Sequence, residues 1–203
     1  MGKITNDMYS KLPNLVFGFH GCRKSTYDAV IVNGEQLKPS ENKYDWLGNG
    51  IYFWENSYER AHDWAKAKYG NDAAVVGAIL DLGHCLNLTD FSSTKVLKRG
   101  YDILTKLYKK TGEELPQNTN GRSETDVLLR NLDCMVIQQI HAYNTERYND
   151  TYDSIRGVFI EGGEVYPGSE FVEKTHIQIC IVNPNCIKGY FKPMERNEEF
   201  RIP

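Results

Sequence analysis

Leu47-Gly48-Asn49-Gly50-Ile51-Tyr52-Phe53 is the stretch that decides the fold, because it sets two glycines directly before an apolar strand. Glycine has no Cβ, so the backbone at Gly48 and Gly50 can come close to another strand or to a ligand. Tyr52 can offer a flat aromatic face to a ring. A Rossmann fingerprint differs, since it needs G-x-G-x-x-G between a strand and a helix. The stretch therefore predicts a strand that approaches a ligand, with a half-buried strand tyrosine as the alternative.

Upstream of this stretch, Phe19-His20-Gly21 closes an apolar run that begins at Leu15 and has strand character. We expect the strand to break at Gly21. The bare backbone of Gly21 offers one N–H donor and one C=O acceptor, which matches the donor and the acceptor of a carboxamide. The alternative is a satisfied histidine at a strand end, followed by a turn.

A third place lies near the end of the chain, in the strand predicted over 174–182. Its alternation puts Ile177, Ile179 and Ile181 on one face and His176, Gln178, Cys180 and Val182 on the other. We expect the first face to be core and the second to face a cleft, with a polar sheet surface as the alternative.

Capping patterns set the expected starts of the first two helices. Ser25 can cap a helix that follows the first strand, and Asn33-Gly34 supplies a left-handed stop. A second helix begins at Asn56 or Ser57, where Glu59 completes a capping-box pattern with Asn56. Between them, the segment 35–46 lacks periodicity and is expected to be a loop that lines a site.

The remaining periodicities are mixed, and strands do not alternate regularly with helices. We expect strands over 75–82, 157–161 and 189–192, helices from Val96 to Gly112 and over Leu128–Gln139, and polar loops over 112–122 and 144–153. This order indicates the α+β class. We expect a single domain over 1–203, with a helical insertion at roughly 93–152 between two sheet-forming halves.

Composition limits the context. No run approaches the ~20 apolar residues that span a bilayer, and Met1–Asn6 is too polar to open a secretory signal. We therefore expect a cytoplasmic protein with no membrane partner and no obligate oligomer. Five cysteines without a C-x-x-C pair indicate reduced thiols and no metal site. A net charge of -3 gives no global attraction to nucleic acid.

In their order and context, the three places resemble the His-Tyr-[Glu/Gln] branch of the ADP-ribosyltransferases, which includes diphtheria toxin and the poly(ADP-ribose) polymerase catalytic domain. The resemblance spans 15–192 and implies a split, mixed or antiparallel β-sheet with flanking helices. It also implies that the co-substrate is NAD. His20 would bond the ribose on the nicotinamide side, Gly21 would hold the carboxamide, and Tyr52 would stack on nicotinamide.

The site implied by this resemblance can be carried over residue by residue. The catalytic residues would be His20, Tyr52 and Gln178, and the NAD-binding residues would be His20, Gly21, Cys22, Ser40, Gly50, Tyr52 and Trp64. Three of these depart from the family pattern. Cys22 stands where Ser or Thr is common, Trp64 is about one position from the second aromatic, and Gln178 replaces the catalytic Glu. A carboxamide can bond ribose hydroxyls, but it cannot take a proton or supply negative charge.

The implied activity is single ADP-ribose transfer, in which the nicotinamide glycosidic bond of NAD breaks and ADP-ribose passes to a protein or nucleic acid. Glu161 or Glu173 is a candidate to assist with the acceptor's proton. By analogy, a small free-standing transferase suits a bacterial toxin or defence enzyme. Basic residues that could form a rim for the acceptor are Lys106, Lys109, Lys110 and Arg122.

Two alternatives belong to other classes. The first is a catalytically inactive module that binds NAD or ADP-ribose and has lost catalysis with the carboxylate. The second is a hydrolase in which Cys22 or Cys180 works with His20 or His176.

Overall fold

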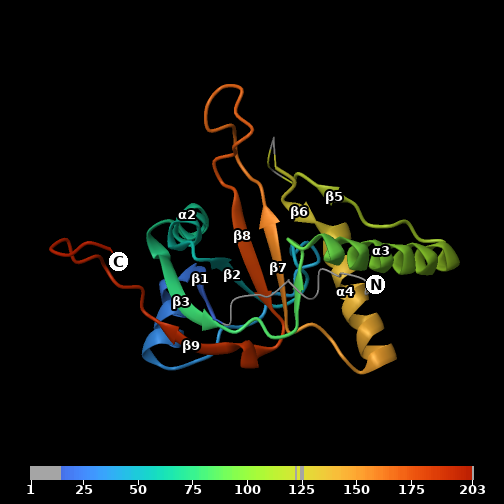
Figure 1. Cartoon of the computed structure of the whole chain (residues 1–203), viewed down its shortest axis with the longest axis horizontal. Helices are drawn as coiled ribbons and strands as arrows, with labels where there is room; N and C mark the ends of the chain where they lie inside the picture. Colours follow the sequence, from blue (N-terminus) through green and yellow to red (C-terminus); the bar gives the residue numbers. More distant parts are fainter. Residues whose placement is uncertain (1–14, 122, 124–125, 203) are drawn as a thin grey trace, which may run out of the picture.

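The computed structural model describes residues 15–121, 123 and 126–202 and belongs to the α+β class, as expected (Figure 1). In chain order the elements are β1 (Val16–Arg23), α1 (Lys24–Tyr27), the π-helix η2 (Asp28–Val32), β2 (Ile51–Glu55), α2 (Tyr58–Tyr69), the short helix η3 (Gly70–Asp72), β3 (Ala73–Leu80), β4 (Cys85–Asn87), α3 (Phe91–Thr111), β5 (Asn118–Thr119), β6 (Leu129–Arg130), α4 (Asn131–Tyr148), β7 (Ser154–Phe159), β8 (His176–Ile181), the short helix η4 (Pro184–Cys186) and β9 (Ile187–Phe191). The segment expected to be a helical insertion holds α3, α4 and the β5–β6 pair.

In the described part of the chain, the strands form a seven-stranded sheet in the order β4-β7-β8-β2-β1-β3-β9. Its neighbouring strands are antiparallel except β4 and β7, which are parallel, so the sheet is mixed. Strand β1 pairs with β3 along its whole length but with β2 through only Gly18↔Glu55 and Phe19↔Trp54. The sheet is therefore continuous but narrow at the β1–β2 seam, which divides it into two halves.

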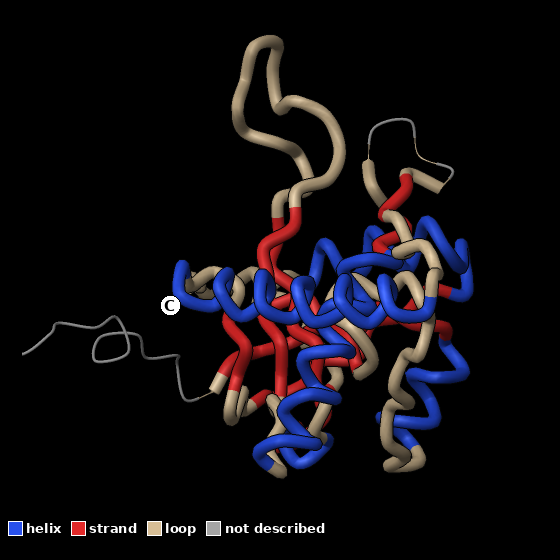
Figure 2. Tube along the Cα trace, turned by 90° about the vertical axis from the view of Figure 1, so that its right-hand side faces the viewer, coloured by secondary structure: helices blue, strands red, loops and turns tan. Residues whose placement is uncertain are grey.

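Helices cover both faces of the sheet. On one face α2 packs against β1, β2 and β3. Further along the same face, α3 and α4 pack over β4, β7 and β8 through Leu97, Ile137 and Ile155. The opposite face is covered by α1 and η2, whose Tyr27 and Val30 pack against Phe53 and its neighbours. In two perpendicular views, the loop between β7 and β8 stands clear of these layers (Figures 1 and 2).

Strand β8 departs from the expected pattern of one core face and one open face. Ile179 and Ile181 are buried on the side of α1, as expected. Cys180 points to the other face, yet it is fully buried under α4. On the same face His176, at the start of the strand, is also buried, and Gln178 between them is half-buried. The prediction of a cleft-facing side was therefore wrong at His176, and at Cys180, which the helical insertion covers.

Several expected boundaries also differ. Strand β1 does not break at Gly21 but runs on to Arg23, because its pairing with β3 continues to that residue. Helix α1 begins directly after β1, without a side-chain cap from Ser25. Ser57 is the N-cap residue of α2, but its side chain caps no backbone N–H, so the expected capping box is absent. The left-handed stop at Gly34 is confirmed by its φ of 73°.

The loop expected over 144–153 is partly helical. Helix α4 continues to Tyr148 and ends at Asn149, which has a left-handed conformation. Its Ile140 packs against Gly100 of α3, where a Cβ would lie 2.5 Å from the Ile140 side chain. Helix α4 thus packs on α3 just beyond the apolar stripe visible in the sequence.

At Gly50, the start of β2 comes very close to β8. The φ of Gly50 is 155°, and a Cβ there would lie 2.5 Å from both Cys180 Sγ and the Ile181 carbonyl oxygen. We expect Gly50→Ala to lower the free energy of unfolding by about 1–3 kcal/mol in urea denaturation, because the strands must move apart. The matched control is Gly163→Ala, where a Cβ meets nothing within 4 Å. Equal stability of the two variants would contradict this account.

Candidate functional site

His20 lies at the β1–β2 seam, directly after the last residue pair of the two strands. Its Nδ1 is 2.8 Å from the backbone oxygen of Tyr52, and its ring meets the Phe53 ring edge-on. Burial is the main influence on its pKa, which lies below the usual range for histidine. The neutral ring must donate from Nδ1, since a carbonyl oxygen can only accept. His20 therefore keeps an unprotonated Nε2 as a hydrogen-bond acceptor.

Gly21 lies beneath helix α2. A Cβ at this position would be 2.4 Å from the Ala61 carbonyl oxygen and 3.2 Å from the Trp64 ring. The need for glycine thus has a packing cause, because α2 comes down onto the strand. The same packing sets the Trp64 ring beside the Gly21 backbone. Trp64 also contacts the Trp54 ring, with centroids 5.5 Å apart, so it serves the core as well.

Tyr52 is tied to the glycine stretch that precedes it. Its hydroxyl donates to the Gly48 carbonyl oxygen at 2.6 Å and accepts from the Leu47 N–H at 2.8 Å. Burial raises its pKa well above the usual range for tyrosine, so the phenol stays protonated. The side chain therefore holds the turn in shape, and its half-buried ring is the part left to contact a ligand.

Of the other residues predicted to bind NAD, Ser40 and Gly50 lie together and Cys22 lies apart. Ser40 and Gly50 exchange backbone hydrogen bonds of 2.7 and 3.0 Å, which fasten the 35–46 loop to the start of β2. Cys22 is buried with the core on the α1 side. Its neighbour Gly21 faces α2, so the Cys22 thiol does not share that side of the strand.

The thiols give no support to the Cys-His hydrolase alternative. Burial raises the pKa of Cys22 to about 11, and it raises that of Cys180 further. A nucleophilic cysteine needs the opposite shift, because the thiolate is the reactive form.

Gln178 lies on β8 opposite Trp54 of β2, which in turn lies opposite Phe19 of β1. With strands about 4.8 Å apart, Gln178 is about 10 Å across the sheet from β1. Directly opposed residues share a face, so Gln178 lies on the side of α2 together with Trp54. Its amide nitrogen is 3.0 Å from Nε2 of His176.

A polar cluster adjoins Gln178. The side chain of His176 is 2% exposed, and its Nδ1 lies 2.6 Å from the Lys174 backbone oxygen. Glu161 lies 3.7 Å from His176 Nε2 and forms an ion pair of 3.0 Å with Arg60 of α2. Burial is the main cause of a raised pKa at Glu161. Of the two carboxylates predicted to assist, Glu161 is thus the one in this cluster, whereas Glu173 is exposed.

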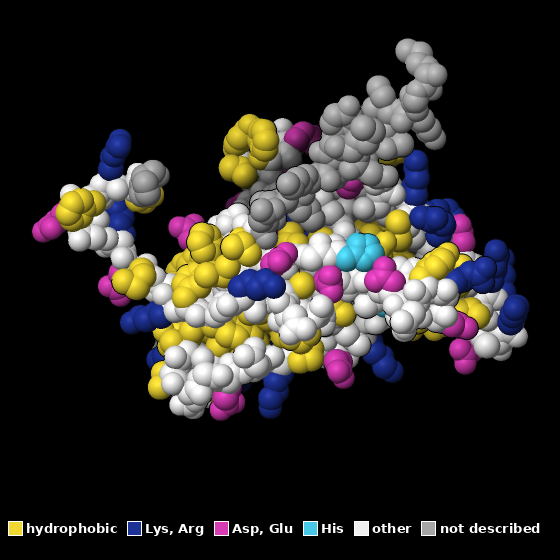
Figure 3. All heavy atoms as spheres, turned by 60° about the horizontal axis from the view of Figure 1, so that its bottom comes forward, with side chains coloured by type: hydrophobic (Ala, Val, Ile, Leu, Met, Phe, Trp, Pro, Cys, Tyr) yellow, Lys and Arg dark blue, Asp and Glu magenta, His cyan; other side chains and the backbone are white. Residues whose placement is uncertain are grey.

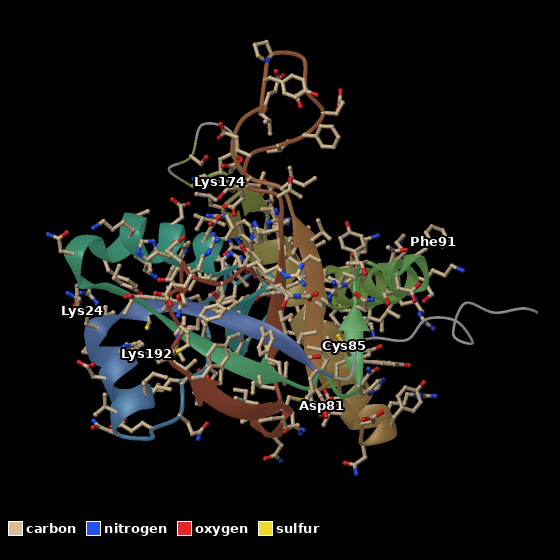
Figure 4. All side chains as sticks on the ribbon, turned by 60° about the vertical axis from the view of Figure 1, so that its left-hand side comes forward. Lys24, Asp81, Cys85, Phe91, Lys174 and Lys192 are labelled. Carbon is tan, nitrogen blue, oxygen red and sulfur yellow. The ribbon has the colours of Figure 1, made fainter. Side chains whose placement is uncertain are left out.

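Arg60 was not predicted from the sequence, because its position is that of an ordinary surface charge on an amphipathic helix. Its side chain is nevertheless only 15% exposed, and its Nε is buried without a hydrogen-bond partner in the described residues. Figure 4 labels Lys174 at the base of the loop that brings Glu161 to Arg60. Such a contact between a helix and a distant loop leaves no periodic signal in the sequence.

A separate cavity of about 510 Å³ lies between β7, α3 and α4. The Arg130 guanidinium is 4.3 Å from the centre of the Trp46 ring and 5.0 Å from that of Phe159 at its wall. Phe159 also meets the His176 ring, with centroids 6.0 Å apart. The Phe159 ring therefore stands between this cavity and the polar cluster.

The expected basic rim is only partly within the described chain. Lys106, Lys109 and Lys110 are exposed on α3, and the last two lie in its final turn, where the helix dipole favours cations. Arg122 lies outside the described residues. On the face drawn in Figure 3, Lys and Arg side chains lie among acidic and hydrophobic ones. Lys109 and Lys110 thus have a sufficient structural explanation at the helix end.

Comparison with known proteins places few limits on function. No family model and no solved structure matches the chain. An uncharacterized protein of Methanocaldococcus jannaschii is 27% identical over 189 residues, which cover 84% of this chain and 83% of that protein. Within the described residues, no helix combines the length and apolar character needed to cross a membrane, and no cluster of three His, Cys, Asp or Glu side chains is arranged to hold a metal.

The buried histidines predict how stability depends on pH. Burial lowers the pKa of His20, His141 and His176 below the 6.5 of an unperturbed histidine. The unfolded chain therefore binds more protons, so the free energy of unfolding should fall as the pH drops below 6.5. Each group contributes up to about 1.4 kcal/mol per pH unit. Urea denaturation from pH 7.5 to 5 should show this slope, and His176→Gln should reduce it. A flat profile in the parent protein would contradict the assignment.

Proposed function

We propose that the chain is a mono-ADP-ribosyltransferase that uses NAD as its co-substrate. The observation that carries the proposal is that His20, Tyr52 and Gln178 come from three distant segments and lie on three consecutive strands, β1, β2 and β8. Sequence order alone does not require this adjacency. It is the arrangement that the resemblance implies for the three motifs.

We propose further that the fold is of the ADP-ribosyltransferase type. The support is the narrow β1–β2 seam, which separates a β4-β7-β8-β2 half from a β1-β3-β9 half. A split sheet opens at such a seam, and His20 lies where the ladder stops. The helices of the insertion then cover the half that carries Gln178.

The proposed chemistry divides NAD binding between the two sides of the seam. The Gly21 backbone and the rings of Trp64 and Tyr52 hold nicotinamide, and Gln178 accepts a hydrogen bond from a ribose hydroxyl on the α2 face. The His20 ring lies against Phe53 on the α1 face, so it reaches the ribose only where the β1–β2 ladder stops. The bond between the ribose C1′ and the nicotinamide nitrogen breaks, and its electron pair neutralises the cationic leaving group. The acceptor then bonds to C1′ and gives up its proton.

In this mechanism Gln178 supplies only a dipole to the oxocarbenium-like sugar, where a carboxylate would supply a charge. Because nicotinamide leaves without needing a proton, positioning can lower much of the barrier. Glu161 is engaged by Arg60 at 3.0 Å, so it can receive the acceptor's proton only if that ion pair loosens.

A macromolecular acceptor is favoured by the loop that leads into β8. Four large apolar side chains on it are exposed to solvent: Ile160, Val165, Tyr166 and Phe171. The loop stands clear of the sheet (Figure 1) and leads into β8 at His176. Exposed apolar residues on a projecting loop are typical of a surface that meets a partner. A role as a toxin or defence enzyme stays a prediction from analogy.

The second candidate is a catalytically inactive module that binds NAD or ADP-ribose. Gln178 favours it, because the described site has no carboxylate at the position where the family has its catalytic Glu. Binding and catalysis are separable by experiment, so the two candidates make different predictions.

The direct test is release of nicotinamide from NAD, measured by chromatography with proteins and nucleic acids as acceptors. We expect His20→Ala to reduce release by about a hundredfold or more, because an interaction with the reacting sugar is lost. Gln178→Glu should raise release about tenfold, because it adds a charge beside the developing cation. His84→Ala is the control. His84 lies in the turn before β4, and strands β7 and β8 separate β4 from the β2–β1 seam.

Two outcomes would go against transfer. Calorimetric binding of NAD with no release by the parent protein and no gain in Gln178→Glu would favour the binding module. If the parent protein neither binds NAD nor releases nicotinamide, both candidates are overturned.

A further inference from the structure

We propose that His176 is a positioning residue that fixes the amide of Gln178, so that the Gln178 carbonyl oxygen is presented to the ribose of NAD. This inference rests on the proposed function for its substrate. Its geometric part concerns only the protein and can be tested without NAD.

The first step is the tautomer of His176. Its Nδ1 lies 2.6 Å from the backbone oxygen of Lys174. A carbonyl oxygen has no proton to give, so Nδ1 must carry one. In a neutral ring Nε2 is then unprotonated and can act only as an acceptor.

The second step is the orientation of Gln178. Its amide is 3.0 Å from His176 Nε2. Only the NH₂ group can donate to an unprotonated nitrogen, so that group faces His176 and the carbonyl oxygen points away from it. The orientation of the Gln178 amide is thus assigned from its hydrogen-bond partner, as is usual for side-chain amides. No hydrogen bond to the carbonyl oxygen is recorded among the described residues.

The third step is the charge state of His176. Burial lowers its pKa, the hydrogen bond to the Lys174 backbone oxygen opposes this, and the nearby cations Arg60 and Arg130 act in the same direction as burial. Glu161 opposes them from 3.7 Å, but its own pKa is raised by burial. The rings of Trp54 and Phe159 lie near the imidazole, with centroids 6.3 and 6.0 Å from its own. These surroundings keep the ring neutral.

The consequence is a hydrogen-bond acceptor on the α2 face of the sheet. The Gln178 carbonyl oxygen can accept there from a ribose hydroxyl, whereas the His20 ring lies against Phe53 on the α1 face. His176 thus preserves in Gln178 the acceptor that a glutamate would offer, although not its charge.

The geometric test is nitrogen NMR of the protein labelled with ¹⁵N-histidine. We expect His176 to show the neutral Nδ1–H tautomer at pH 7. In Gln178→Glu the new carboxylate requires a donor, so the pKa of His176 should rise above 6.5. A neutral Nε2–H tautomer in the parent protein, or no change in titration in Gln178→Glu, would overturn the proposal whether or not the protein uses NAD.

The functional test compares His176→Gln, which can still offer an acceptor near Nε2, with His176→Leu, which cannot. We expect kcat/KM for nicotinamide release to fall about tenfold in His176→Leu, and His176→Gln to recover most of that loss. Unfolding midpoints show that each variant is folded. Equal losses in the two folded variants would overturn the positioning role. If the parent protein neither binds NAD nor releases nicotinamide, the proposed function is overturned instead. The NMR result would still decide the geometry.

Discussion

One hydrogen bond, from His20 Nδ1–H to the Tyr52 carbonyl oxygen, crosses the sheet where its own ladder stops. Strands β1 and β2 share only two residue pairs, and this bond follows directly after them. It joins the two halves of the sheet, fixes the tautomer of His20, and leaves Nε2 to accept a bond from a ligand. The tyrosine whose backbone it uses also holds the glycine turn through its hydroxyl.

Around this seam, polar side chains bond to partners that can only accept or only donate a hydrogen bond, which fixes their protons and orientation. Backbone oxygens fix the protons of His20 and His176, and His176 then fixes the amide of Gln178. Arg60 and Glu161 close the arrangement with a largely buried ion pair. Buried polar networks of this kind are costly unless every member is satisfied. Because of this cost, the buried polar network is stronger evidence for a site here than the sequence motifs are alone.

Much of the fold was predictable from sequence, since β2, β3, α3 and the mixed α+β order follow from apolar periodicity and turn residues. The errors have physical causes. Pairing with β3 carries β1 past Gly21, and α4 runs beyond the predicted helix to the left-handed Asn149. Local patterns predicted that Tyr52 and Gln178 lie on strands, whereas their role in a site stays a prediction from the resemblance. The turning of Cys22 toward the core and the recruitment of Arg60 depend on long-range contacts, which no local pattern encodes.

The most direct test of the central claim, that the β1–β2 seam binds the nicotinamide end of NAD, is a crystal structure of the Gln178→Ala variant, chosen to slow turnover, with NAD. The account predicts the carboxamide on the Gly21 backbone beside Trp64, and the adjoining ribose within hydrogen-bond distance of His20 Nε2. Nucleotide density only in the cavity beside Trp46 and Arg130, with the seam empty, would contradict it.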